Sequence, residues 1–210
     1  MRRLPLTDLF PWFQPLHEFV EQHGRMDWAT FFGNDQPVEI DVGCGRGLFV
    51  FTAAKTQPQT NFLGIEKDFK EARRGARRLK KIDSSNGRIF GGDVFELFEK
   101  VLPEQSVDAI HVYFPDPWWK RRHRSRRVFN DRLVNLAVKL LKPRGYLHSW
   151  TDVEEYFDVI SALMNNDERF ETLPPPEERA PSNDFDYHTS FERKKRKLGL
   201  PIYRGMWRLK

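Results

Sequence analysis

The sequence contains little cysteine and no long apolar segment. Its single cysteine is Cys44, in a chain of 210 residues. One cysteine cannot form an intrachain disulfide, which favours a reducing compartment. No apolar run approaches the roughly 18 residues that a membrane-spanning helix needs. The segment Leu4–Phe13 is interrupted by Pro5, Asp8 and Pro11, so it makes a poor signal peptide. We therefore expect a cytoplasmic protein with no membrane partner.

The composition is that of a folded, basic chain. Hydrophobic residues make up 39% and charged residues 31%, which excludes an intrinsically disordered protein. The length is enough for one domain with a full core. The formal net charge is +5. Such an excess is compatible with a soluble basic surface or with binding of a polyanion, and the clustering of the charges must decide.

From residue 38 onward, apolar segments alternate with helical patterns. This alternation is typical of a mostly parallel sheet with helices on both faces. We expect strands at 38–42, 62–66, 88–90, 107–114, 146–150, 170–173 and 203–209, and helices at 48–55, 69–81, 94–102, 131–141 and 153–164. The prediction is thus a seven-stranded α/β domain over 37–210. Residues 1–36 would form an N-terminal extension with a short helix at 15–22, and the proline-rich stretch 174–188 a mobile loop.

Carboxylates occur at the ends of five expected strands. In a parallel α/β sheet, ligands bind at the carboxyl ends of the strands, near the switch in strand order. One such acid would be weak evidence for a site, but five along one rim of a sheet are much stronger. The five residues are Asp41, Glu66, Asp93, Asp116 and Asp152.

A glycine turn, Gly43-Cys44-Gly45-Arg46-Gly47, follows the first of these strands. The dinucleotide fingerprint G-x-G-x-x-G would need its third glycine at Leu48, which argues against a dehydrogenase. A cationic cofactor suits an acidic rim better than a pyrophosphate does, and S-adenosylmethionine carries an ammonium and a sulfonium but no phosphate. Gly43 and Gly45 would let such a ligand approach the backbone closely.

Each acid of the cofactor site has a role and an alternative. Asp41 would attract the methionine ammonium, Glu66 would accept hydrogen bonds from ribose hydroxyls, and Asp93 would approach the adenine edge. The glycine turn is also compatible with an ordinary tight turn. Glu66 is compatible with a surface acid, and Asp93 with a cap of the helix that follows it.

Three basic clusters surround this expected rim. They lie on one face of the helix at 69–81, in Lys120–Arg127 and in Arg193–Lys197. A solvated charged face is the alternative, but an exposed helix face usually mixes signs. Together the clusters predict a large polyanionic substrate, with nucleic acid the obvious one. Trp118 and Trp119 precede the second cluster and would either stack on an exposed base or pack against the site.

The stretch FPDPW-x-K followed by a basic run, at Phe114–Arg127, resembles the signature of bacterial tRNA (guanine-N7-)-methyltransferases, the TrmB family. The resemblance covers roughly residues 28–210, including the segment before the first strand, Gly64-Ile65-Glu66, Thr151-Asp152 and Thr189–Glu192. It implies a Rossmann-like class I S-adenosylmethionine-dependent methyltransferase fold. The family's first acid is usually Glu, whereas this chain has Asp41.

The resemblance also implies roles for individual positions. The cofactor would be bound by Asp41, Glu66, Asp93 and Asp116, and Asp116 would lie at the active centre. The substrate nucleotide would be contacted by Lys120, Asp152, Thr189, Ser190, Phe191 and Glu192. The RNA would lie along Arg122, His123, Arg124, Arg126 and Arg127. The target would be N7 of a guanine in the tRNA variable loop, position 46 in tRNA numbering.

Guanine N7 carries an in-plane lone pair and no proton, so methylation needs no general base. This agrees with the lack of a Ser-His-Asp or Cys-His set, and we expect Asp116 to stabilise the cationic product unless it is only a turn acid held by prolines. We expect a monomer or weak homodimer that uses no metal. Alternatives are a methyltransferase for another RNA, a small molecule or a protein, and a non-catalytic RNA-binding protein on a degenerate methyltransferase fold.

Overall fold

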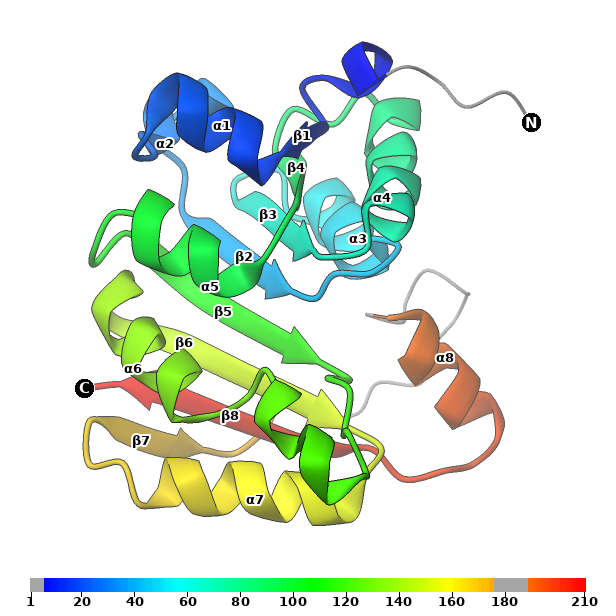
Figure 1. Ribbon diagram of the computed structural model, residues 1–210, viewed down its shortest axis with the longest axis vertical. Helices are drawn as coiled ribbons and strands as arrows, with labels where there is room; N and C mark the ends of the chain where they lie inside the picture. The colour runs from blue at the N-terminus through cyan, green and yellow to red at the C-terminus, as the bar shows by residue number, and fades with distance from the viewer. Residues whose placement is uncertain (1–5, 176–188) are drawn as a thin grey trace.

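The computed structural model describes residues 6–175 and 189–210, and one eight-stranded sheet runs through its centre (Figure 1). The strand order is β1-β4-β3-β2-β5-β6-β8-β7. Strands β1 to β6 pair in parallel, and β8 runs antiparallel to both of its neighbours, β6 and β7. The strands are β1 (Phe13–Pro15), β2 (Val38–Val42), β3 (Asn61–Glu66), β4 (Gly87–Gly91), β5 (Val107–Tyr113), β6 (Leu141–Thr151), β7 (Phe170–Leu173) and β8 (Tyr203–Leu209).

The expected α/β architecture is confirmed, but the prediction of seven strands is wrong by one. The additional strand, β1, comes from the N-terminal segment and pairs in parallel with β4, Phe13 lying opposite Ile89. Only three residues long and bounded by Pro11 and Pro15, β1 shows no alternation long enough to read from the sequence. Prolines restrict strands to sheet edges, which is where β1 lies.

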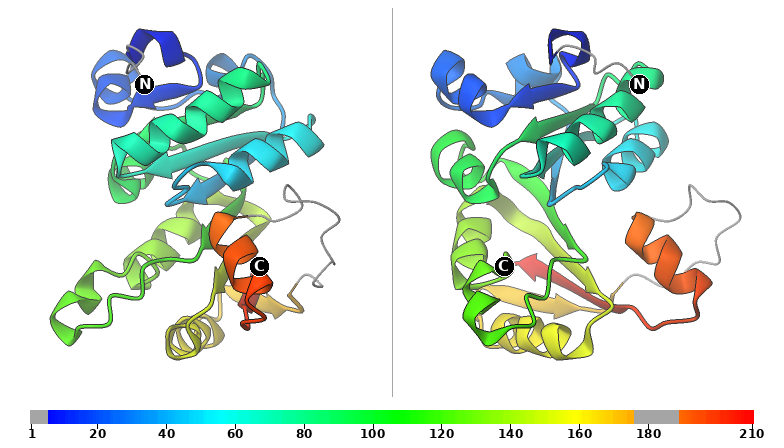
Figure 2. Two further views of the ribbon diagram at one scale, coloured as in Figure 1. Left: turned by 90° about the vertical axis from the view of Figure 1, so that its right-hand side faces the viewer. Right: turned by 45° about the vertical axis from the view of Figure 1, so that its right-hand side comes forward.

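Helices cover the sheet in two layers, seen edge-on in Figure 2. One face packs against α3 and α4, and the other against α1, α2, α6, α7 and the α5–η2 segment. The helical elements are η1 (Leu6–Leu9), α1 (Leu16–His23), α2 (Trp28–Phe32), α3 (Leu48–Thr56), α4 (Phe69–Lys81), α5 (Val94–Glu96), the π-turn η2 (Leu97–Val101), the 3-10 helix η3 (Arg121–Arg126), α6 (Asp131–Leu140), α7 (Glu154–Asn165) and α8 (Ser190–Lys197).

Helix α4 shows how the sequence pattern becomes packing. Asp68 begins the helix by accepting hydrogen bonds from the amides of Lys70 and Glu71, at 2.8 and 3.3 Å. Ala72, Gly75, Ala76 and Leu79 are buried against the sheet. The arginines and lysines at the intervening positions therefore remain on the outer face, as the spacing predicts.

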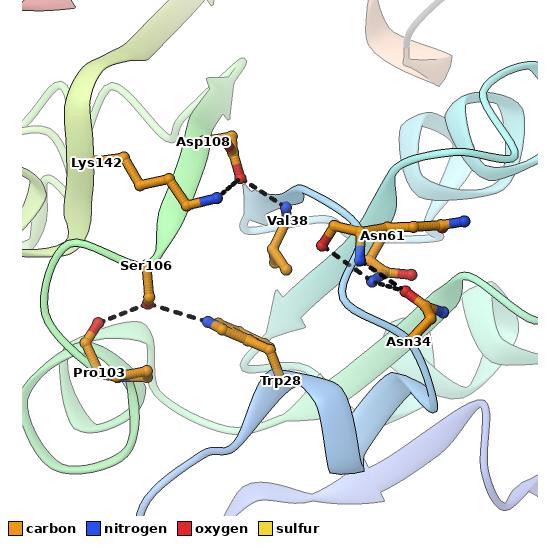
Figure 3. A network of polar contacts seen from close by, with 9 residues as sticks. Trp28, Asn34, Val38, Asn61, Pro103, Ser106, Asp108 and Lys142 are labelled. Atoms are coloured by element: carbon orange, nitrogen blue, oxygen red, sulfur yellow. Dashed lines mark hydrogen bonds and ion pairs between the residues drawn. The ribbon is translucent and has the colours of Figure 1, made fainter.

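Side-chain hydrogen bonds fasten the N-terminal segment to the edge of the sheet opposite the strand ends that carry the acids (Figure 3). Trp28 donates its indole N–H to the Ser106 hydroxyl at 3.0 Å. Asp108 accepts from the Val38 amide at 2.9 Å and from the Lys142 ammonium at 2.8 Å. These contacts fix the amino ends of β2, β5 and β6, so the carboxyl ends of the strands are presented in a defined register.

Other differences lie at element boundaries. Strand β6 begins at Leu141, directly after α6, and its pairing with β5 jumps from Leu141 to Tyr146 across an irregularity. The segment Lys142-Pro143-Arg144-Gly145, which lies between the expected helix at 131–141 and the expected strand at 146–150, therefore belongs to the strand. Helix α8 was not expected. Most of the proline-rich stretch, 176–188, lies outside the described residues.

Candidate active site

The acidic residues are ordered along one rim of the sheet by the strand order. The central run of the sheet is β4-β3-β2-β5-β6, with all five strands parallel. Their carboxyl ends consequently lie at the same edge. Along that edge the acids follow in the spatial order Asp93, Glu66, Asp41, Asp116, Asp152. Because β2 is central, Asp41 lies in the middle of the row.

The glycine turn between β2 and α3 adopts left-handed backbone angles at all three glycines, with φ of 70°, 52° and 61° at Gly43, Gly45 and Gly47. A Cβ at Gly47 would lie 2.8 Å from Ile89 Cδ1 and 3.0 Å from the Gly75 Cα, so α4 can approach only a glycine here. A Cβ at Gly43 or Gly45 would meet no atom within 4 Å. The outer side of the turn is therefore open to a ligand.

Asp41 is buried, with 4% of its surface exposed. Burial, and secondarily the charge of Glu66, raises the pKa of the Asp41 carboxyl to about 8. No cation among the described residues is paired with it in an ion pair. A buried carboxyl of this kind is a suitable partner for a ligand's ammonium group.

Glu66, at the end of β3, closes the glycine turn. Its two carboxylate oxygens accept hydrogen bonds from the Gly45 amide at 2.9 Å and from the Asp68 amide at 2.8 Å. The side chain thus connects the turn after β2 with the start of α4. It lies where the sequence predicts a cofactor-binding acid, and it is only partly buried.

Asp93 has two partners in this structure. One carboxylate oxygen accepts from the Phe95 amide at 2.9 Å and so caps α5, and the other pairs with the Lys67 ammonium at 3.2 Å. Asp93 thus caps the helix that follows it, which leaves open whether it also binds the cofactor. A contact of Asp93 with adenine stays a prediction, because no described interaction tests it.

The loop that carries Asp116 is built on two unusual backbone positions. Phe114 and Trp118 have φ of 51° and 43°, values that non-glycine residues rarely adopt. Phe114 donates its amide to the Trp150 carbonyl at 2.7 Å, and Arg127 donates to the Pro117 carbonyl at 2.8 Å. Strain of this kind persists only where neighbouring contacts enforce it, and it is concentrated at functional sites. The Asp116 carboxylate is exposed at the tip.

The basic run after Asp116 divides into two kinds of side chain. Lys120, Arg121, Arg122 and Arg124 are exposed on or beside η3. Arg126 is also exposed, but its guanidinium lies over the Trp118 ring, with Cζ 5.1 Å from the ring centroid, and His123 meets the same ring edge-on at 5.8 Å. Arg127 is half-buried and turned toward the protein. The run is therefore partly a cationic surface and partly the support of its own loop.

Helix α8 brings the predicted substrate-contacting segment to the rim, beyond the carboxyl ends of β5 and β6 (Figures 1 and 2). Thr189 begins it by accepting from the Glu192 amide at 2.9 Å. Glu192 is buried and pairs with Arg196 at 3.3 Å, while Phe191 is exposed and stacks on Phe114 at 6.2 Å between ring centroids.

Lys195 on α8 forms an ion pair with Asp152 at 2.5 Å. The structure thus joins the two predicted substrate-contacting segments, which are 37 positions apart at Asp152 and Thr189. Sequence reasoning missed this role of Lys195. Only the recognition of 190–197 as a helix would have shown that Lys195 lies one turn from Phe191.

A buried polar cluster behind the rim was also missed. His111 contacts Glu39 at 2.7 Å and the Tyr113 hydroxyl at 2.9 Å, and its ring stacks on His148 at 4.9 Å. The register that places His111 opposite Asp41 was available only once the strands were paired. Among the described residues, no group of three or more His, Cys, Asp or Glu is placed to hold a metal ion. In the same part of the chain, no helix is both long and apolar enough for a membrane span.

Comparisons with known proteins agree with this geometry. A family model described as a putative methyltransferase matches residues 35–205. The curated tRNA (guanine-N(7)-)-methyltransferase of Rhodopirellula baltica is 41% identical over 97% of this chain and 76% of its own length. The enzyme of the same name from Cronobacter sakazakii is 33% identical over 88% of this chain and 75% of its own. The chain belongs to the tRNA (guanine-N(7)-)-methyltransferase family.

The fold of this chain resembles solved structures of class I methyltransferases. A 30S ribosomal methyltransferase from an uncultured bacterium superposes with a TM-score of 0.61, at 18% identity over 87% of this chain and 92% of the other. An rRNA methylase from Streptococcus thermophilus gives 0.54, at 13% identity over 92% of this chain and 93% of the other. At such identities the likeness establishes the fold alone.

Proposed function

We propose that this chain transfers a methyl group from S-adenosylmethionine to N7 of a guanine in the variable loop of tRNA. One observation carries the proposal: the buried carboxyl of Asp41, which forms no ion pair with any described residue, lies beside an open glycine turn on the same rim as an exposed basic loop. The rim suits a cationic cofactor and the loop suits a polyanion. Family membership supports the same pairing of cofactor and substrate.

The residues present fit S-adenosylmethionine. When bound, this cofactor supplies a methyl group on a positively charged sulfur. Asp41 offers its carboxyl to the methionine ammonium, and Gly43 and Gly45 leave space for close approach to the backbone. Glu66, already oriented by two amide hydrogen bonds, offers its remaining lone pairs to ribose hydroxyls. Asp93 completes the site on the adenine side.

The protein's part in the chemistry is positioning. The guanine N7 lone pair would accept the methyl group that S-adenosylmethionine supplies, and no protein group would have to move a proton. Holding the reacting atoms in line at near-attack distance supplies much of the rate enhancement of such reactions. The loop around Asp116, held by the hydrogen bonds of Phe114 and Arg127, and helix α8, capped by Thr189, are the elements that would hold the substrate for that task.

The expected role of Asp116 is to stabilise positive charge on the substrate base. Methylation at N7 places a positive charge on the guanine ring, and a carboxylate close to the base stabilises this charge as it develops. The exposed position of Asp116 at the loop tip makes its carboxylate accessible to substrate. On this reading Asp116 also accepts a hydrogen bond from guanine N1–H or the N2 amino group.

The substrate is held from two sides. Lys120 and the exposed arginines of the basic run contact phosphates, and Asp152 with the Thr189–Glu192 segment contacts the nucleotide. The ion pair between Lys195 and Asp152 orients that carboxylate before substrate arrives. We infer further that residues 37–210 act as one catalytic domain and that the protein works in the cytoplasm. We also infer that it is a monomer or weak homodimer, and sedimentation analysis would test this oligomeric state.

The decisive experiment is methyl transfer from labelled cofactor to bulk tRNA, followed by borohydride and aniline treatment. Chain cleavage at a labelled guanine in the variable loop is the expected result, because N7-methylation makes the glycosidic bond labile. Label in tRNA without aniline-sensitive sites would refute N7 as the target. Label transferred only to ribosomal RNA or to small molecules would refute tRNA as the substrate.

A further inference from the structure

The two adjacent tryptophans after Asp116 have different surroundings. Trp118 is enclosed by its own loop, with the Arg126 guanidinium 5.1 Å from its ring centroid and the His123 ring edge-on at 5.8 Å. Trp119 is 62% exposed. The positive φ of Trp118, 43°, turns the chain between the two residues. Trp118 therefore packs within the loop and supports it, whereas Trp119 is exposed to solvent.

The surroundings of Trp119 are cationic. Lys120, Arg121 and Arg122 follow it directly and are exposed. The exposed indole of Trp119 lies among cationic side chains and three residues from Asp116, so its ring face is available to an aromatic partner that arrives with phosphates. Proteins that bind single-stranded nucleic acid combine these two features, a basic track and an aromatic ring on which a base can stack.

We propose that Trp119 stacks on a tRNA nucleobase next to the target guanine. Guanine N7 must be presented to the rim, which takes the guanine out of its stack and leaves a neighbouring base with one bare face. The Trp119 indole covers that face. Stacking uses the π-surface, which every base has, so this contact contributes affinity and positioning without selecting a base.

This inference rests on the proposed function. The test measures binding of an unmodified tRNA transcript at several salt concentrations, together with its methylation. Trp119→Ala should weaken binding by about 5- to 150-fold, the range that one base stack contributes. The slope of log Kd against log salt should stay as in the wild type, because no phosphate contact is lost. Trp119→Phe should retain most of the affinity.

Two control variants separate the effect of stacking from the effects of charge and of a general loss of an exposed aromatic ring. Arg122→Ala, an exposed cation of the same loop, should reduce the salt slope. Phe10→Ala removes an aromatic ring that is 64% exposed in the N-terminal segment, and should bind tRNA within twofold of the wild type. Cofactor affinity should be equal in all of them.

Three outcomes would overturn the stacking role: binding by Trp119→Ala within twofold of the wild type, a loss in Trp119→Phe as large as in Trp119→Ala, or a fall in the salt slope like that of Arg122→Ala. If one of these outcomes is found and the wild-type chain still methylates tRNA, the stacking role is refuted but the proposed function is not. A wild-type chain that methylates no tRNA would refute the function itself.

Discussion

The Arg127 guanidinium lies over the Tyr156 ring, with Cζ 4.4 Å from the ring centroid. Its Nε donates at the same time to the Pro117 carbonyl at 2.8 Å. Tyr156 is fully buried in α7, so Arg127 connects the core to the residue that follows Asp116. This contact fixes the height of the Asp116 loop above the sheet. The sequence had placed Arg127 among the RNA-contacting residues, a prediction that remains open.

Replacing Arg127 should therefore affect turnover more than tRNA binding. Arg127→Lys keeps the charge but loses the planar group that stacks on Tyr156 and bonds Pro117. We expect kcat to fall about 10- to 100-fold from misplacement of Asp116, with an unchanged salt dependence of tRNA binding. Arg124→Lys, in the exposed part of the run, is the matched control and should keep wild-type kcat. A reduced salt slope for Arg127→Ala with normal kcat would show that Arg127 serves the RNA instead.

Asp41 should make the free protein less stable as the pH rises. Its pKa is about 8 in the folded chain and about 4 unfolded, so the unfolded state loses the proton first. The Asp41 contribution to the free energy of unfolding therefore falls between pH 4 and 8 and is constant outside that window. Asp41→Asn should raise stability at pH 7 by on the order of 2–4 kcal/mol and flatten this dependence, while weakening cofactor binding. Urea unfolding of the wild type and of Asp41→Asn at pH 5 and pH 8 measures this change in the free energy of unfolding. An equal pH dependence in the two proteins would contradict the assignment to Asp41.

The ion pair of Lys195 with Asp152 should matter for substrate and little for stability. Both side chains are partly exposed, so the pair contributes at most about 1 kcal/mol to folding. Lys195→Met should nevertheless raise KM for tRNA about tenfold, because Asp152 loses its orienting partner. The neighbouring Lys194→Met is the control. In combination with Asp152→Asn, the Lys195 effect on KM should shrink; fully additive effects would mean that the two residues act separately.

Two glycines of the turn should respond differently to alanine. Gly47→Ala places a methyl against Ile89 and the Gly75 backbone at positive φ, and should cost about 2–4 kcal/mol of stability. Gly45→Ala faces open space, so only the backbone strain of about 1–2 kcal/mol remains. Gly45→Ala should instead weaken cofactor binding more than tRNA binding. Denaturation and cofactor titration of both variants would decide, and equal stability losses would contradict the steric argument.

Asp116→Asn should reduce kcat about 100- to 1,000-fold by removing the charge beside the reacting base. The side chain is exposed, so the free energy of unfolding should change by less than about 0.5 kcal/mol. Single-turnover methylation at saturating tRNA isolates the chemical step. Wild-type single-turnover rates with intact cofactor binding would remove Asp116 from catalysis.

Much of the fold was accessible from the sequence because its determinants are local. The strand that ends before Gly43 and the helix after Asp68 follow from apolar periodicity and capping residues within a few positions. Strand β1 was not accessible, because three residues carry no period and their pairing partner is far along the chain. Helix α8 was hidden by composition: its run of lysines and arginines shows charge but little apolar pattern.

The rim of acids was predicted because parallel strands order their ends by simple geometry. What the sequence could not show was the partner of each side chain. Lys195 beside Asp152 and Arg127 over Tyr156 join elements distant in sequence, and only the folded chain defines such pairs. The distinction between the enclosed Trp118 and the displayed Trp119 depends on one backbone angle that composition does not encode.

Helix α8 lies in the connection between two paired strands, β7 and β8. The chain leaves the sheet at Leu173 and re-enters it at Tyr203, and β7 and β8 hold these ends together, with Leu173 opposite Met206. Lengthening a loop whose ends are already closed costs little, since the closure entropy grows only slowly with length. The segment between β7 and β8 can therefore vary in length and charge without disturbing the sheet. Helix α8, with its ion pair to Asp152, is therefore attached to the rim through a connection whose two ends are already held together by the pairing of β7 with β8.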